Sequence, residues 1–143
     1  MSVTLVTGGA GYIGSHTCVE LLLAGRDVVV VDDLSNASPE ALRRVEKLGG
    51  RALKAFVHGD VRDRALMAKV FAEHAVEAVI HFAAKKAVGE SVAQPLAYYD
   101  NNLQGLLSVL QTMDAAGCRR MVFSSSATVY GDPARVPIDE AFR

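Results

Sequence analysis

The alternation of short apolar runs with helix-patterned segments constrains the fold of this chain more than any other feature of its sequence. Four consecutive valines, Val28–Val31, form a run with no polar side, which is typical of a strand buried on both faces of a parallel sheet. In other segments, such as 12–24, apolar residues recur at helical spacing. Strands that alternate with helices predict an α/β fold with a doubly wound parallel sheet and right-handed crossovers.

Five strands and at least four helices are expected in this fold. The expected strands cover residues 3–7, 28–31, 52–58, 78–82 and 121–123. Ser38 and Pro39 predict the start of one helix, because serine caps helix N-termini and proline fits the first helical position. A long helix is expected from Pro95 to about Ala116. We interpret its apolar stripe as core or as a helix–helix seam; the stripe comprises Tyr99, Leu103, Leu106, Leu110 and Met113.

Length and composition restrict the classes of protein to which this chain can belong. Its 143 residues allow one domain. A net charge of −1 offers no general attraction to nucleic acid or to an anionic membrane. No apolar run reaches the roughly 18 residues of a membrane span, and the N-terminus lacks the basic region of a signal peptide. We therefore expect a cytoplasmic protein, with no metal site and with Cys18 and Cys118 as buried or partly buried, reduced thiols.

A glycine-rich segment between the first strand and the first helix carries the strongest chemical signal. It satisfies G-x-G-x-x-G through Gly9, Gly11 and Gly14, and it also satisfies a G-x-x-G-x-x-G spacing through Gly8, Gly11 and Gly14. Glycines let the backbone turn tightly and approach a pyrophosphate, while the helix N-terminus presents N–H groups to that anion. The position between a strand and a helix predicts a dinucleotide site.

Acidic residues at two strand ends refine this prediction. Asp32 lies eighteen positions beyond Gly14, where a carboxylate accepts hydrogen bonds from an adenosine ribose and repels a 2′-phosphate. No arginine or lysine stands within residues 32–39, so NAD is favoured over NADP. Asp60 follows the third strand, at the edge where the adenine would rest. A turn or capping role is the alternative for Asp33 and Asp60.

Five segments of the chain resemble the extended short-chain dehydrogenase/reductases. They are Thr7–Gly14, Gly59–Val61, His81–Ala84, Tyr98–Asn102 and Ser124–Gly131. Within that family, three stretches are most similar to the UDP-glucose 4-epimerases, namely Gly11–Cys18, Lys86–Ser91 and Ser124–Gly131. The resemblance extends over essentially the whole chain in the expected order.

The resemblance implies a role for particular residues. The pyrophosphate would be wrapped by Gly8, Gly11, Tyr12, Ile13 and Gly14, and the adenosine ribose held by Asp32, Asp33, Leu34, Ser35 and Asn36. The adenine would be flanked by Asp60 and Val61, and the nicotinamide half of the site lined by Phe82, Ala83, Ala84, Lys86 and Asn101. Ser126 matches the catalytic serine of the family. His81 is expected to be structural, and Lys85 to be solvated.

The resemblance also implies a reaction and partners. It implies NAD-dependent epimerisation of UDP-galactose and UDP-glucose at C4 through a 4-keto intermediate, with the long helix at a homodimer interface. Ala127 and Thr128 stand where related 4,6-dehydratases carry an acid–base pair, so water elimination is disfavoured.

The tyrosine–lysine pair of this reaction, at Y-x-x-x-K spacing, does not occur in the sequence. Four positions beyond the four tyrosines stand His16, Asn102, Leu103 and Ala134. We expect residues 1–143 to form an incomplete NAD-binding Rossmann-like domain, without the C-terminal strands and the substrate domain. The chain would then be poorly soluble and inactive as an epimerase. The alternatives are a catalytically inactive NAD-binding fragment or module, and another nucleotide-sugar epimerase or reductase of the same family.

Overall fold

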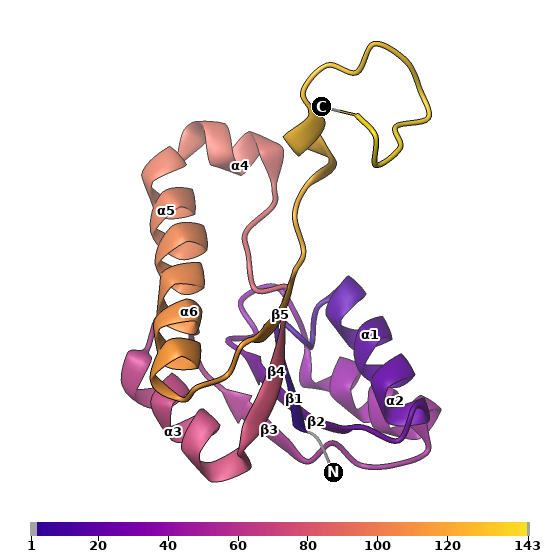
Figure 1. Cartoon of the computed structure of the whole chain (residues 1–143), viewed down its shortest axis with the longest axis vertical. Helices are drawn as coiled ribbons and strands as arrows, with labels where there is room; N and C mark the ends of the chain where they lie inside the picture. Colours follow the sequence, from indigo (N-terminus) through magenta and orange to yellow (C-terminus); the bar gives the residue numbers. More distant parts are fainter. Residues whose placement is uncertain (1–2, 143) are drawn as a thin grey trace.

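Five parallel strands form one sheet in the order β3-β2-β1-β4-β5, and the computed structural model describes residues 3–142 of the chain (Figure 1). The strands are β1 (Val3–Thr7), β2 (Asp27–Asp32), β3 (Ala55–His58), β4 (Val76–His81) and β5 (Arg120–Phe123). This is the predicted doubly wound α/β sheet, with β3 shorter and β4 longer at the N-terminal end than the apolar pattern suggests.

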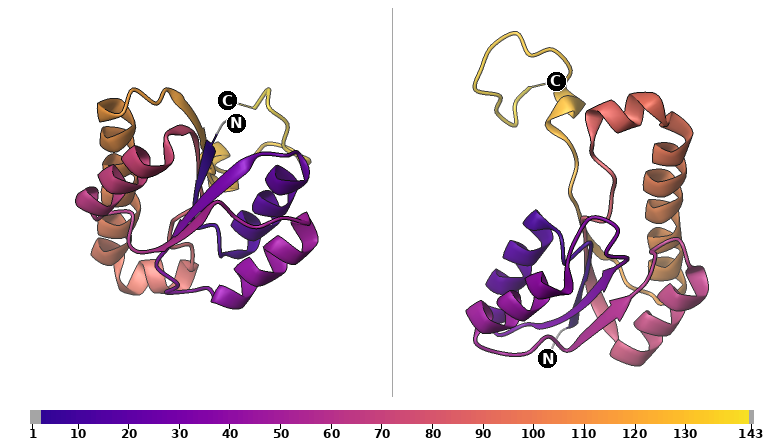
Figure 2. Two further views of the ribbon diagram at one scale, coloured as in Figure 1. Left: turned by 90° about the horizontal axis from the view of Figure 1, so that it is seen from below. Right: turned by 180° about the vertical axis from the view of Figure 1, so that it is seen from behind.

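Helices cover both faces of the sheet, so the molecule has three layers (Figure 2). One face carries α1 (Tyr12–Leu23) and α2 (Pro39–Gly49), and the other carries α3 (Arg64–His74) and a helical column. The column consists of α5 (Pro95–Tyr99), a π-helical turn η1 (Asp100–Gln104) and α6 (Gly105–Ala115). Two short elements lie beyond the sheet: α4 (Val88–Ala93) and the 3-10 helix η2 (Ala127–Tyr130).

The valines of β2 divide between two apolar cores. Val29 and Val31 pack with α3 and α6, whereas Val28 and Val30 pack with α1 and α2. All four side chains are fully buried, and burial of each contributes roughly 1.5 kcal/mol of transfer free energy. The two-sided burial predicted from the apolar run is confirmed.

The predicted start of α2 is also confirmed. The Ser38 side chain accepts a hydrogen bond from the backbone N–H of Glu40 at 3.3 Å, with Pro39 in the first turn. Gly50 ends the helix with a φ of 68°, a left-handed conformation that glycine adopts without strain.

The column differs from the uninterrupted helix expected over 95–116, because η1 inserts a π turn into it. Of the two interpretations of its apolar stripe, core does not hold for Tyr99, Leu103 and Leu110, which are 63%, 52% and 42% exposed, and a helix–helix seam stays the prediction for them. Met113 is buried, as expected. None of the helices within residues 3–142 is both long and apolar enough to cross a membrane.

Candidate cofactor site

A pocket of about 510 Å³ opens at the carboxyl edge of the sheet. The connection after β1 leads to one side of the sheet and the connection after β4 leads to the other, so the direction of the chain switches between these two strands. In open α/β sheets this switch point is where ligands bind. The pocket is lined by Gly8, Gly11, Tyr12, Ile13, Gly14, Val31, Asp32, Asp33, Ser35, Asn36, Ala37, Gly59, Asp60, Val61, Phe82, Ala83, Ala84, Lys85, Lys86, Ala87, Tyr98 and Asn101.

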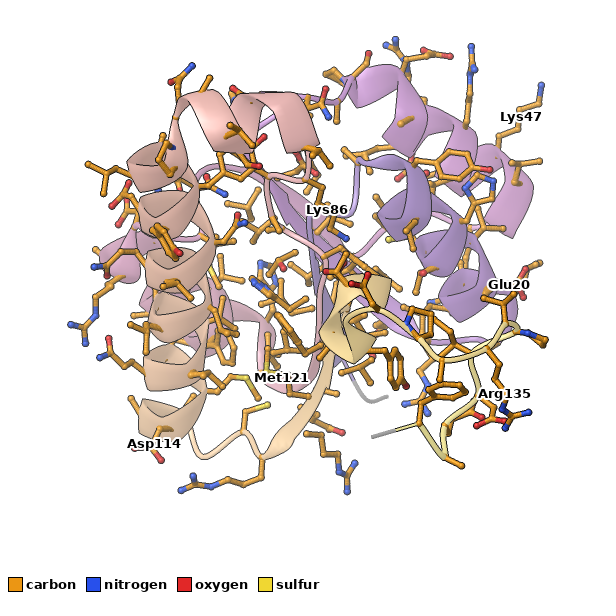
Figure 3. All side chains as sticks on the ribbon, turned by 90° about the horizontal axis from the view of Figure 1, so that it is seen from above. Glu20, Lys47, Lys86, Asp114, Met121 and Arg135 are labelled. Carbon is orange, nitrogen blue, oxygen red and sulfur yellow. The ribbon has the colours of Figure 1, made fainter. Side chains whose placement is uncertain are left out.

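Every residue assigned to the cofactor from the sequence lines this pocket, with the exception of Leu34. Leu34 has a φ of 57° and packs against the core under α1 and α2. The pocket also contains lining residues that sequence reasoning missed, among them Tyr98 and Lys85, the latter expected to be solvated. Lys86, labelled in Figure 3, lies between the two helical layers.

Close backbone packing distinguishes the two glycine spacings. A Cβ atom on Gly8 would lie 2.7 Å from the Ala83 nitrogen, and one on Gly14 would lie 2.2 Å from the Gly8 oxygen. A Cβ on Gly9 would instead meet the methyl groups of Val30 at 2.8 Å, so this glycine is required by packing on β2. Gly8, Gly11 and Gly14 face the pocket, and the G-x-x-G-x-x-G spacing is therefore the one that lines it.

The N-terminus of α1 opens toward this pocket. Gly11 is its N-cap and has no side chain to accept from the first-turn amides. Tyr12 and Ile13 follow at the pocket wall, 83% and 53% exposed. N–H groups of a first helical turn lack partners within the helix and carry the positive end of its dipole. The loop can therefore hold an anion such as a pyrophosphate.

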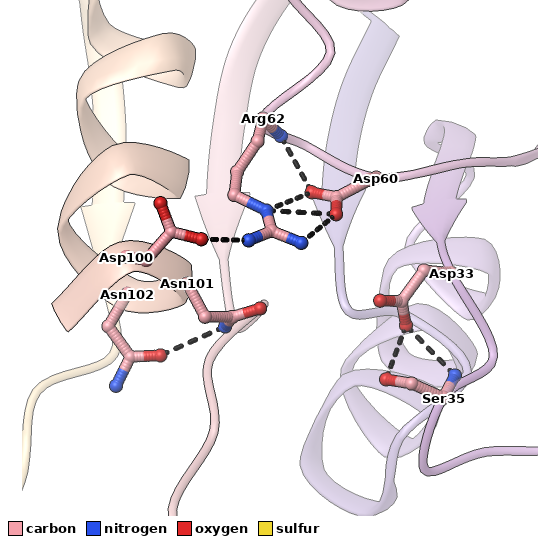
Figure 4. Close-up of polar contacts among 7 residues, drawn as sticks. All are labelled: Asp33, Ser35, Asp60, Arg62, Asp100, Asn101 and Asn102. Atoms are coloured by element: carbon pink, nitrogen blue, oxygen red, sulfur yellow. Dashed lines mark hydrogen bonds and ion pairs between the residues drawn. The ribbon is translucent and has the colours of Figure 1, made fainter. Parts of the chain in front are cut away.

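Asp32 connects the end of β2 to the glycine loop. Its Oδ2 accepts a hydrogen bond from the Ala10 N–H at 2.9 Å, and its Oδ1 accepts one from the Leu34 N–H at 2.9 Å. An ionised carboxylate has about four acceptor positions, so two remain for a ligand. Asp33 lines the pocket and also forms a turn, since its Oδ1 accepts from both the N–H and the hydroxyl of Ser35 (Figure 4).

Arg62 lies between two carboxylates, those of Asp60 and Asp100 (Figure 4). Hydrogen bonds from Arg62 hold the pKa of Asp60 below its usual value, although partial burial acts in the opposite direction. Sequence reasoning did not single out Arg62. The signal in the sequence that could have identified Arg62 was its position, as a basic residue two positions after Asp60.

The π turn holds the segment that follows β4. Asn102 Oδ1 accepts from the Lys85 N–H at 2.8 Å, and Asn102 Nδ2 donates to the Lys85 oxygen at 3.0 Å. Tyr98 adds a second attachment, because its hydroxyl accepts from the Ala87 N–H at 3.1 Å and donates to Glu90 at 2.7 Å. We call residues 83–87 the strap. π turns occur frequently at functional sites, and this one also places Asn101 on the pocket wall.

Replacement of Asn102 by alanine is expected to loosen the strap, because both hydrogen bonds to Lys85 are lost. The cost in unfolding free energy is about 1–3 kcal/mol. Amide hydrogen exchange should show faster exchange at Lys85, while Asn102→Asp, which keeps only the acceptor, should give an intermediate rate. Unchanged exchange at Lys85 in Asn102→Ala would contradict this assignment.

His81 is structural, as predicted. It is 2% exposed, its Nδ1 lies 2.7 Å from the Thr7 hydroxyl, and its ring stacks on Phe123. Burial lowers the pKa of His81 to about 4, so the imidazole is neutral at pH 7.

Cys18 and Cys118 are free and buried, as expected. Burial, together with the charge of Asp32, raises the pKa of Cys18 to about 12, which leaves its thiol unreactive. Within residues 3–142, no group of three or more histidine, cysteine or acidic side chains could hold a metal ion.

Ser126 does not line the pocket. It is exposed and caps η2, where its Oγ accepts from the Thr128 N–H at 3.3 Å and lies 2.8 Å from the Thr128 hydroxyl. The segment that carries it leaves the sheet after the edge strand β5 (Figure 1). Its catalytic role stays a prediction.

The sheet order and the glycine-loop pocket define a Rossmann-like dinucleotide-binding protein. The chain belongs to the NAD dependent epimerase/dehydratase family, whose model matches residues 4–143. It is 55% identical over 137 residues to a UDP-glucose 4-epimerase of Klebsiella pneumoniae, covering 96% of this chain and 98% of the relative.

Two further relatives are longer than this chain. The UDP-glucose 4-epimerase of Haemophilus influenzae is 59% identical over 136 residues, which cover 95% of this chain and 40% of the relative. A crystal structure of the Bifidobacterium longum UDP-glucose 4-epimerase in complex with NAD+ and UDP is 54% identical, with a TM-score of 0.94; the match covers 99% of this chain and 42% of that one. The chain thus spans about 40% of the length of these two proteins and corresponds to the N-terminal part of such epimerases.

Proposed function

We propose that residues 1–143 form an NAD-binding domain. The observation that carries this proposal is a pocket at the switch point whose wall combines Gly8, Gly11 and Gly14 with the carboxylate of Asp32. The glycines leave room for a pyrophosphate against the N-terminus of α1, and Asp32 offers two acceptor positions to ribose hydroxyls. Both features suit NAD.

The remaining wall residues suit the other parts of the cofactor. Asp33, Ser35 and Asn36 border the ribose region together with the turn at Leu34, and Asp60 and Val61 border the adenine region. The nicotinamide region is lined by Phe82, Ala83, Ala84, Lys86 and Asn101. Bound NAD would supply a reversible hydride acceptor, and the strap and the π turn would hold the residues that line its nicotinamide half.

We further propose that this domain serves the C4 epimerisation of UDP-galactose and UDP-glucose, within galactose metabolism. Family membership and relatives at 55% and 59% identity support this reaction. Ser126 is the residue we assign to the reacting sugar hydroxyl. The exposed apolar side chains of Leu96, Tyr99 and Leu103 on the column would form a homodimer interface.

Titration with NAD and NADP tests cofactor binding directly. The wild-type chain is expected to prefer NAD, because Asp32 repels a 2′-phosphate. Asp32→Asn should weaken NAD binding by at least about tenfold, since one hydrogen bond to a charged group contributes about 1.5 kcal/mol and the new amide nitrogen cannot accept from the N–H of Ala10 or Leu34. It should also bring the two affinities closer together. Glu77→Gln is the matched control, because it removes one exposed carboxylate at the opposite edge of the sheet. Equal affinities in the wild type would contradict the assignment of Asp32.

The second candidate function is an NAD-binding module without a reaction of its own. The specific observation is that none of the four tyrosines in the 143 residues is followed by lysine four positions later. A coupled assay with UDP-galactose and the purified chain separates the candidates. Turnover would contradict the module, whereas NAD binding without turnover would support it.

A further inference from the structure

We propose that Arg62 is a positioning residue that makes the pocket select a dinucleotide whose purine base carries an exocyclic amino group. It does so by holding the Asp60 carboxylate in one orientation at the pocket wall. The inference rests on the proposed binding of NAD, and it concerns a residue that does not itself line the pocket.

Arg62 approaches Asp60 through three N–H groups. The backbone N–H of Arg62 donates to Oδ1 at 2.8 Å, and Nη2 donates to Oδ2 at 2.6 Å. Nε is shared between the two oxygens, at 2.9 Å from Oδ2 and 3.1 Å from Oδ1. Charge-assisted contacts of this forked kind constrain geometry as well as adding energy, so the carboxylate cannot rotate freely.

These contacts limit the number of further hydrogen bonds that the Asp60 carboxylate can accept. Of about four acceptor positions, the backbone N–H and Nη2 take one each and the shared Nε takes at least one more, so at most one remains for a ligand. Because Arg62 keeps the pKa of Asp60 below its usual value, the carboxylate is ionised at pH 7 and can only accept. An amino group on the base would donate to it, whereas a carbonyl oxygen in the same place would be repelled.

The other side of the guanidinium reaches the helical column. Arg62 Nη1 donates to Asp100, the first residue of η1, thirty-eight positions away in the sequence. Asn101, the next residue, lines the pocket. Arg62 therefore connects the loop after β3 to the turn that carries a second wall of the site (Figure 4).

Stability alone does not account for this arrangement. The side chains of Arg62, Asp60 and Asp100 are 38%, 33% and 58% exposed, and ion pairs at such exposed positions contribute little to folding. The main effect of the bridge is thus geometric. It also follows that variants at Arg62 should fold and can be compared directly with the wild type.

The test measures the dissociation constants of NAD and of nicotinamide hypoxanthine dinucleotide, in which a carbonyl replaces the adenine amino group. We expect the wild type to bind NAD about tenfold more tightly than the analogue, the effect of one charge-assisted hydrogen bond. Arg62→Gln should bring the ratio of the two dissociation constants close to one, chiefly by weakening the binding of NAD. Arg62→Lys keeps the charge but not the fork, and an intermediate ratio is expected.

Asp100→Asn is the matched control, since it weakens the contact between Arg62 and residue 100 and leaves the contacts between Arg62 and Asp60 in place. It should keep the wild-type ratio. A wild-type ratio in Arg62→Gln, or equal affinities in the wild type, would overturn the inference while leaving NAD binding intact. A wild type that binds neither dinucleotide would overturn the proposed function and this inference with it.

Discussion

Replacement of Gly14 by alanine is expected to abolish dinucleotide binding and to destabilise the fold by about 3 kcal/mol. The new Cβ would lie 2.2 Å from the Gly8 oxygen and 2.8 Å from the Gly9 Cα, both backbone atoms that no side-chain rotation can move away. The loop must therefore shift as a whole. The amides at the start of α1 would then no longer present their N–H groups at the pocket wall.

Gly89→Ala provides the matched comparison. Gly89 lies in α4, and a Cβ there would meet nothing within 4 Å. Alanine favours a helix over glycine by up to about 1 kcal/mol, so this variant should be neutral or slightly more stable. Thermal unfolding and NAD titration of both variants check the expectation. NAD affinity in Gly14→Ala within twofold of the wild type would show that the close approach in the loop is not required.

Acidification from pH 6.5 to pH 4 is expected to reduce the unfolding free energy by about 3 kcal/mol through His81 alone. The pKa of this imidazole is about 4 when folded, against 6.5 as the ordinary value. Between these values the unfolded chain binds a proton that the folded chain does not, so protonation favours unfolding. The stabilisation is complete above pH 6.5 and is lost as the pH falls.

Urea unfolding between pH 4 and pH 7 measures this dependence. His81→Asn removes the titrating group, and its unfolding free energy should vary less with pH over that window than the wild type does. His74→Asn is the control, because His74 lies at the end of α3 rather than in the core. Parallel pH profiles for His81→Asn and the wild type would contradict the buried, neutral state of His81.

The elements of this fold could largely be predicted from local patterns. Four buried valines in sequence suit a parallel strand whose two faces are both covered by helices, and Ser38 with Pro39 satisfies the local requirements of a helix start. Both predictions depend on interactions within a few residues. The π turn at Asp100–Gln104 escaped prediction, since the apolar repeat around it continues at nearly helical spacing.

The wall of the pocket could be predicted in part for the same reason. Asp32 ends β2 and Asp60 lies two residues beyond the end of β3, and the carboxyl ends of parallel strands meet at one edge of the sheet. Ser126 also follows a strand, yet the segment after β5 leaves the sheet, so this residue lies outside the pocket.

The sequence by itself determined that this chain forms a parallel sheet with a glycine loop and an acid at the next strand end, because apolar periodicity and glycine spacing are local properties. Only the tertiary structure decided which glycines line the pocket, since Gly8 and Gly9 differ in whether Ala83 or Val30 lies opposite. It likewise decided that Asn102 holds Lys85 and that Arg62 reaches Asp100. Such pairs depend on where the strands and the helical column bring distant side chains together, and no periodicity in the chain encodes that distance.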